Sequence, residues 1–210
     1  MRDAPVFFCE DQYGKDFWKP MIRILLVEEN PTRFSSFDKF RFVHFYPPPL
    51  TDPNRWHDLI RDKATTNAWK VYFIIDFDKI CHEPDYQTKI NRIKNEADAE
   101  VEFFTIKNCL ESLICLDFHV LEDFVQSGKN FNEIYETNKS KIQNIFERNG
   151  CHKRFLKDFF KHTCTETYKE STIPQKVVKN MDWKSLKNNN EELSNFIESL
   201  SSYWDFLGIS

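Results

Sequence analysis

Glycine is scarce in this chain, with 4 residues in 210. Loops that cradle nucleotide phosphates need several closely spaced glycines, so a Walker-type NTPase is not expected. Aromatic residues are abundant instead, at 16% of the sequence and with 21 Phe. A chain of this length and composition can bury a sizeable core and is not expected to be disordered.

Long hydrophobic runs are also missing, since no apolar stretch approaches the ~18 residues that indicate a membrane-spanning helix. The first 20 residues contain seven charged side chains, which a secretory signal peptide does not tolerate. We therefore expect a soluble, cytoplasmic protein.

The six cysteines include no CxxC pair. Several lie in apolar surroundings, as buried thiols in a reducing compartment do, so no disulfide is expected. Cys151, His152, His162 and Cys164 lie close together in the sequence, but their spacing fits no common structural zinc pattern. A solvated helix with incidental His and Cys is the simpler interpretation, and a zinc site is the alternative.

The net charge of −4 argues weakly against a nucleic-acid partner. Residues 151–187, however, contain nine Lys or Arg and only four acids. On a helix predicted over residues 151–162, Lys153, Lys157 and Lys161 recur every four residues and form one cationic stripe, joined by Arg154. Such a stripe suits the phosphate backbone of a nucleic acid, although surface lysines often serve solubility alone.

Short apolar runs bounded by charge or proline predict four buried strands, at residues 21–27, 42–46, 71–75 and 101–106. Helical patterns at about 52–68 and 85–98 separate the later strands, which predicts an α/β fold: a parallel sheet of about four strands with helices on both faces. Residues 1–20 are interpreted as an N-terminal arm, 21–125 as the α/β domain and 126–210 as a helical C-terminal extension. Within the extension, we expect a loop at 187–190 and a last helix at 191–206.

Acidic residues follow two of the predicted strands directly. Glu28 ends the first strand, and Asp76 and Asp78 end the third. The carboxyl ends of parallel strands collect ligands, and residues spaced by two point to the same side of a strand. Clustered carboxylates select hard cations such as Mg²⁺ or Mn²⁺, so a metal site is predicted here. The alternative is that the acids simply begin polar loops.

These segments resemble a known family. Leu26-Val27-Glu28 is similar to the first motif of the Toprim domain, and the segment from Ile74 to Asp78 is similar to its DxD motif. Toprim domains occur in topoisomerases, primases, small maturation ribonucleases and OLD-type nucleases. The segment 108–116, with Glu111, further resembles the acid-bearing helix of RloB-like and abortive-infection-associated Toprim proteins of phage-defence systems. The resemblance covers roughly residues 22–120.

The resemblance implies a metal-dependent nuclease that cleaves phosphodiester bonds of RNA or DNA, acting as a toxic effector in anti-phage defence. Glu28, Asp76 and Asp78 would bind Mg²⁺ or Mn²⁺, with Glu28 as general acid/base, and Glu111 would be a further ligand or orienting residue. An ATPase or other regulatory partner protein is also implied. The family usually has Gly after the first acid, whereas this chain has Glu29, which puts catalysis in question.

Two other interpretations stay open. Asp76 and Asp78 also fit the DxD motif of a HAD-type phosphohydrolase, although the third acid lies upstream on another predicted strand. A catalytically degenerate Toprim module, serving as a binding or regulatory subunit, is favoured by Glu29 and by the scarcity of glycine.

Overall fold

The computed structural model describes residues 4–10, 12–28, 30–44, 67–76, 86–97, 99–106, 109–148 and 150–209. Four strands form one sheet in which all neighbours are parallel, in the order β2-β1-β3-β4. They are β1 (Val6–Cys9), β2 (Arg41–His44), β3 (Val71–Asp76) and β4 (Val101–Ile106). The predicted fold class, a four-stranded parallel α/β sheet followed by a helical C-terminal region, is confirmed.

Helices make up most of the remaining described chain. They are α1 (Gly14–Leu26), α2 (Phe34–Phe37), α5 (Tyr86–Glu96), α6 (Leu110–Leu116), α7 (Phe131–Glu147), α8 (Lys153–Thr163), α9 (Ile173–Val177), α10 (Trp183–Asn189) and α11 (Glu191–Phe206), with 3₁₀ turns η1 (Pro31–Arg33) and η2 (Phe118–Phe124).

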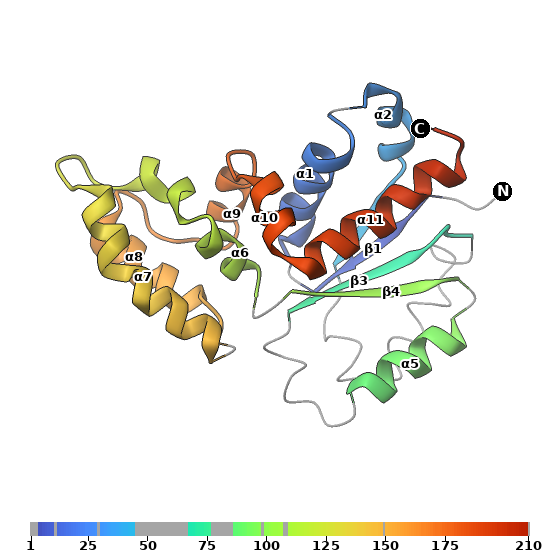
Figure 1. Ribbon diagram of the computed structural model, residues 1–210, viewed down its shortest axis with the longest axis horizontal. Coiled ribbons are helices and arrows are strands. Elements are labelled where there is room, and N and C mark those ends of the chain that lie inside the picture. Colours follow the sequence, from blue (N-terminus) through green and yellow to red (C-terminus); the bar gives the residue numbers. More distant parts are fainter. Residues whose placement is uncertain are drawn as a thin grey trace.

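Helices cover both faces of the sheet, with α1 and α11 on one side and α5 on the other (Figure 1). Side chains alternate along each strand, so Phe7, Tyr72 and Phe104 face the core shared with α1 and α11, while Phe8 and Phe73 face the core shared with α5. The helices α6 to α9 gather beyond the carboxyl ends of the strands (Figure 1). These ends therefore face the helical part of the molecule.

Stacked aromatic rings run across the strands and help to fix their register. On one face, Phe7 stacks between Phe42 and Tyr72, with ring centroids 4.6 and 5.1 Å away. On the other face, Phe73 stacks between Phe8 and Phe103, at 5.2 and 5.0 Å. Several of the many Phe residues of this sequence thus lie in the sheet itself.

The strand predicted at residues 21–27 is wrong, because these residues belong to α1 and to the turn that follows it. The helix carries Pro20 in its interior, where proline removes a backbone hydrogen bond and normally ends a helix. Buried residues recur at helical spacing across it, at Phe17, Trp18, Met21, Ile22 and Leu26. This amphipathic packing keeps the helix continuous through the proline.

The N-terminal arm predicted at residues 1–20 is also wrong. Residues 6–9 form β1, which pairs with both β2 and β3 inside the sheet. All four residues of β1 are buried, so the sheet is built around this segment.

Most later elements follow the sequence prediction. The structure confirms strands at β2, β3 and β4 and helices at α5, α8 and α11. The helix predicted at 52–68 falls outside the described residues except for its last two. The loop predicted at 187–190 is wrong, since α10 extends through Asn189 and only Asn190 separates it from α11.

The predicted C-terminal extension shares its core with the sheet region. Phe196 of α11 stacks on Phe104 of β4, with ring centroids 4.3 Å apart, and one apolar cluster continues from there to Phe118, Phe155 and Phe160. A membrane-crossing helix must be long and apolar along its whole length, and the helices of the described residues include none that qualifies.

Candidate functional site

Two acids end neighbouring strands at the centre of the sheet. Glu10 directly follows β1, and Asp76 is the last residue of β3. The chain continues from β1 into α1 on one face of the sheet, and the next described helix after β3 is α5 on the opposite face. In open α/β sheets, ligands bind where the helices that follow adjacent strands leave toward opposite faces. Glu10 and Asp76 lie at this point.

The two acids are in direct contact. The backbone N–H of Asp76 donates a hydrogen bond to Oε2 of Glu10 over 3.2 Å, and the backbone N–H of Glu10 donates to the carbonyl of Ile74 over 3.1 Å. Glu10 is only 6% exposed, whereas Asp76 is half-buried. The sheet ladder thus extends one residue past β1 and aims the Glu10 carboxylate at the end of β3.

Gly14 allows the first turn of α1 to pack on this edge. A Cβ atom at position 14 would lie 3.0 Å from the Cβ of Cys9 and 3.2 Å from the Trp18 ring, closer than side chains normally approach. Glycine therefore brings the start of α1 directly against the carboxyl end of β1.

Glu28 does not lie at the sheet edge that its predicted role requires. It follows the C-terminus of α1, its side chain is 51% exposed, and its Oε1 lies 3.6 Å from Nε of Arg23. Glu28 was predicted to lie at the end of a strand only because residues 21–27 were predicted to be that strand. Glu29 and Asp78 lie outside the described residues.

Glu111 lies in the first turn of α6, which follows β4, as the sequence predicts for an acid after the fourth strand. It is 4% exposed and accepts a hydrogen bond from the Tyr168 hydroxyl at Oε1 over 2.9 Å. Burial, together with the Glu111 charge, raises the pKa of the neighbouring Cys115 thiol well above its ordinary value. This acid is enclosed by protein.

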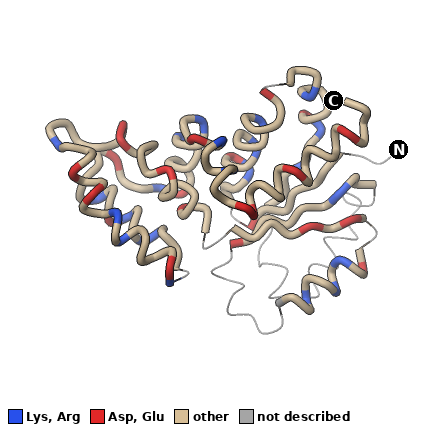
Figure 2. The backbone as a smooth tube through the Cα atoms, in the orientation of Figure 1, with Lys and Arg blue, Asp and Glu red and all other residues tan. Residues whose placement is uncertain are grey.

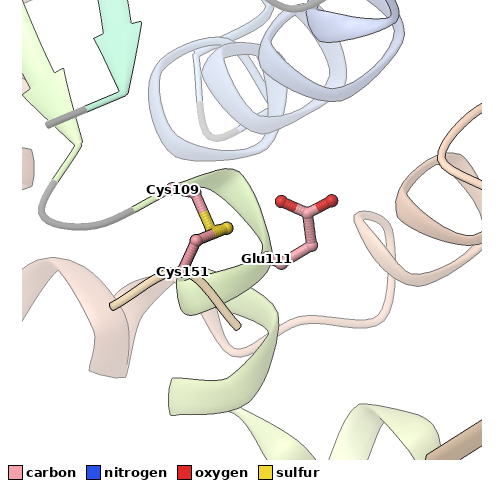
Figure 3. Close-up of side chains that lie close together, drawn as sticks. All are labelled: Cys109, Glu111 and Cys151. Atoms are coloured by element: carbon pink, nitrogen blue, oxygen red, sulfur yellow. A yellow bond between two sulfur atoms is a disulfide. The ribbon is translucent and has the colours of Figure 1, made fainter. Parts of the chain in front are cut away.

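A disulfide joins Cys109 to Cys151, so the expectation of no disulfide is wrong for this pair. Figure 3 shows the Glu111 carboxylate beside it, with ligand atoms of Cys109, Glu111 and Cys151 all within 4.8 Å of one another. In the described part of the chain this is the only such group of three His, Cys, Asp or Glu side chains. Glu10, Asp76 and Glu111 therefore do not converge on one point. Cys115 and Cys164 are free and buried, as expected, and Cys9 is buried as well.

His152 belongs to the packing around the disulfide. Its Nε2 lies 3.1 Å from the Ile142 carbonyl, which can only accept, so Nε2 carries the proton. Its Nδ1 lies 2.9 Å from the Ser112 hydroxyl, which donates to it. Burial lowers the pKa of His152 despite the bond to Ile142. The alternative zinc site is not assembled, because His162 turns to the carbonyl of Asp158 and Cys151 is cross-linked.

The cationic stripe lies on α8 as predicted, but two of its lysines share an acidic partner. Lys153 and Lys157 approach Glu170 to 2.5 and 3.2 Å. Partial burial would raise the pKa of Glu170, yet the hydrogen bonds from both lysines outweigh burial and lower it. Arg154 and Lys161 are exposed on the same helix.

Sequence reasoning missed Glu10, although a signal was present. Val6-Phe7-Phe8-Cys9 is a short run of residues that favour strands, and an acid follows it. The same rule that selected Asp76 after β3 applies to this run. The first strand was instead predicted in the longer apolar stretch after Pro20.

No family model, no curated protein and no solved structure matches this chain.

Proposed function

We propose that this protein is a divalent-metal-dependent nuclease that hydrolyses phosphodiester bonds, with Glu10 and Asp76 at its centre. The observation that supports this most is the contact between two carboxylate residues at the carboxyl ends of adjacent parallel strands, at the point where the following helices part.

The donor chemistry of this edge fits Mg²⁺ or Mn²⁺. Glu10 and Asp76 offer hard oxygen ligands, which Mg²⁺ and Mn²⁺ prefer. Asp78 is included in the proposed ligand set on the ground of its spacing from Asp76. Glu10 takes the position that the sequence interpretation gave to Glu28.

A bound Mg²⁺ would polarise the scissile phosphate and stabilise the leaving oxygen. Asp76 and Asp78 would hold the metal, and Glu10 would accept the proton of the attacking water. The hydrogen bond from the Asp76 backbone orients the Glu10 carboxylate for this task. Glu111 lies inside the protein against Tyr168 and acts as a positioning residue for α6.

Several expectations from the sequence analysis remain predictions. A toxic role in anti-phage defence, an ATPase or other regulatory partner, and membership of the Toprim or RloB-like proteins rest on resemblance alone. The cytoplasmic location, a HAD-like phosphohydrolase and a degenerate Toprim module are likewise neither supported nor contradicted.

The proposal is tested by incubating the purified protein with single- and double-stranded RNA and DNA, in Mn²⁺ or in chelator. We expect cleavage only with metal. Glu10→Gln and Asp76→Asn are each expected to lower the cleavage rate by about 1,000-fold, or roughly 4 kcal/mol of transition-state stabilisation.

Glu122→Gln with Asp123→Asn is the matched control, since it removes two exposed acids of η2. This control should cleave at the wild-type rate. Metal-dependent cleavage that survives in both Glu10→Gln and Asp76→Asn would refute the assignment, as would its loss in Glu28→Gln alone.

A further inference from the structure

A groove of about 730 Å³ runs beside α1, between that helix, α2 and α9. Four cationic side chains line it: Lys15, Lys19 and Arg23 from α1, and Lys179, which follows α9. Its lining residues are separate from the cationic stripe on α8.

The three α1 cations form a regular row. They are spaced by four residues, which places one positive charge about every 6 Å along one side of the helix. Figure 2 shows basic positions along α1 in the upper part of the molecule. A row of equally spaced charges matches a polymer that carries one negative charge per repeat better than it matches a single small anion.

Aromatic rings support two of these cations. The Nζ of Lys19 lies 5.8 Å from the Phe37 ring centroid, and the Arg23 guanidinium lies 5.2 Å from that of Phe34. Such contacts hold a cation in place without cancelling its charge. Among the described residues, Lys15, Lys19 and Lys179 take part in no ion pair.

The groove also contains three carboxylates, and two of them already have partners. Glu28 pairs with Arg23, and Asp16 accepts a hydrogen bond from Nε2 of Gln175 over 3.0 Å. Asp38 is the third. The surplus of positive charge is therefore small in total and concentrated in the lysines.

The row begins one residue after Gly14, near the carboxyl end of β1. Gly14 packs against Cys9, and Lys15 is the next residue, so the near end of the groove adjoins the carboxyl end of β1. We propose that this groove binds the phosphodiester backbone of a single-stranded nucleic acid and leads it to the edge where Glu10 and Asp76 lie. The inference rests on the proposed nuclease function and names the track of its substrate.

Binding and cleavage are measured separately so that the two proposals can fail independently. The probe is a fluorescently labelled single-stranded RNA of about 12 nucleotides, titrated in EDTA, where no metal-dependent cleavage occurs. The triple variant Lys15→Gln, Lys19→Gln and Lys179→Gln is expected to weaken binding at least about tenfold. Its plot of log affinity against log salt should lose about 2 units of slope, since each phosphate contact contributes about 0.7 in single strands.

The control variant is Lys94→Gln, Lys139→Gln and Lys141→Gln, which removes the same charge from exposed positions of α5 and α7. It should bind within about threefold of wild type and keep the salt slope. Circular dichroism checks that both triple variants are folded.

Four results would overturn the groove proposal: no binding by wild type, equal weakening in the control, unchanged binding by the groove variant, or loss of binding in Lys153→Gln with Lys157→Gln alone. Equal displacement of the RNA by a polyglutamate of matched charge would also contradict it, and would assign the groove to acidic polypeptides. Binding that depends on the groove lysines, without any cleavage, would instead refute the nuclease function. The proposal that the groove binds a nucleic acid would then still hold.

Discussion

Two buried acids stand near the carboxyl ends of the strands, and their surroundings differ. Glu10 and Glu111 are 6% and 4% exposed. Glu10 extends a strand and meets Asp76, another acid, across the sheet. Glu111 starts a helix and meets the Tyr168 hydroxyl beside a disulfide. Burial is nearly the same for both acids and therefore does not separate their proposed roles. The residue that each acid contacts does separate them.

The Glu111 surroundings tie the start of α6 to the start of α8. Cys109 follows β4 and Cys151 precedes α8, so their disulfide joins the sheet edge to the α7–α8 connection across 42 residues. Ser112 and His152 form a second link between the same segments. We expect changes here to alter stability, whereas changes at Glu10 and Asp76 should alter activity.

The largest stability effect is expected from the disulfide. Cys109→Ser with Cys151→Ser should lower the free energy of unfolding by about 4 kcal/mol, because a cross-link across 42 residues restricts the unfolded chain. Urea unfolding monitored by Trp fluorescence measures the change. A reducing agent should lower the stability of wild type by a similar amount and leave the double variant unaffected; equal stability of all four samples would refute the structural role.

Removal of the Tyr168 hydroxyl should have a smaller effect. Tyr168→Phe takes one hydrogen bond from the buried Glu111 carboxyl, which we expect to cost about 2 kcal/mol of unfolding free energy. Tyr135→Phe is the control, because its hydroxyl makes no hydrogen bond within the described residues, and it should change stability by less than about 0.5 kcal/mol. Chemical denaturation compares the two. Equal losses would show that the Glu111 contact contributes nothing specific.

The pH dependence of stability should report on His152, with the smallest of these effects. Burial lowers the pKa of His152 in the folded protein, so the unfolded chain takes up this proton first as the pH falls. The His152 contribution to stability is complete above the unfolded pKa of about 6.5 and declines as the pH drops toward the lowered folded pKa.

His152→Gln removes the titrating group. We expect the difference in unfolding free energy between wild type and this variant to shrink as the pH falls from about 8 to about 5. Denaturant titrations at several pH values measure it. A difference that is constant or grows toward low pH would contradict a buried neutral His152.

The sequence predicted β3 and β4 best. β3 and β4 are uninterrupted apolar or alternating runs bounded by charge, and Asp76 was placed correctly at a strand end. The first strand was misplaced because the residues after Pro20 are apolar and a proline usually ends a helix. Only packing against the sheet, through Trp18 and Met21, shows that this stretch is a helix.

The sequence analysis expected Glu28, Asp76 and Asp78 at the ends of two strands, with Glu111 as a further residue. The structure places Glu10, not Glu28, beside Asp76, because the strand predicted at residues 21–27 is part of α1. The contact of Cys109 with Cys151 could not be predicted, since it depends on how α7 folds back over 42 residues. The spacing of two cysteines in the sequence does not show how close they lie in the folded chain.

Mn²⁺ binding tests the central claim most directly, because it requires neither the right substrate nor a partner protein. Calorimetric titration should show that wild type binds Mn²⁺ and that Glu10→Gln or Asp76→Asn weakens binding by at least about tenfold, or roughly 1.4 kcal/mol. Glu28→Gln should bind Mn²⁺ with wild-type affinity. If Glu28→Gln lost metal while Glu10→Gln retained it, the assignment of the site to the ends of β1 and β3 would be contradicted.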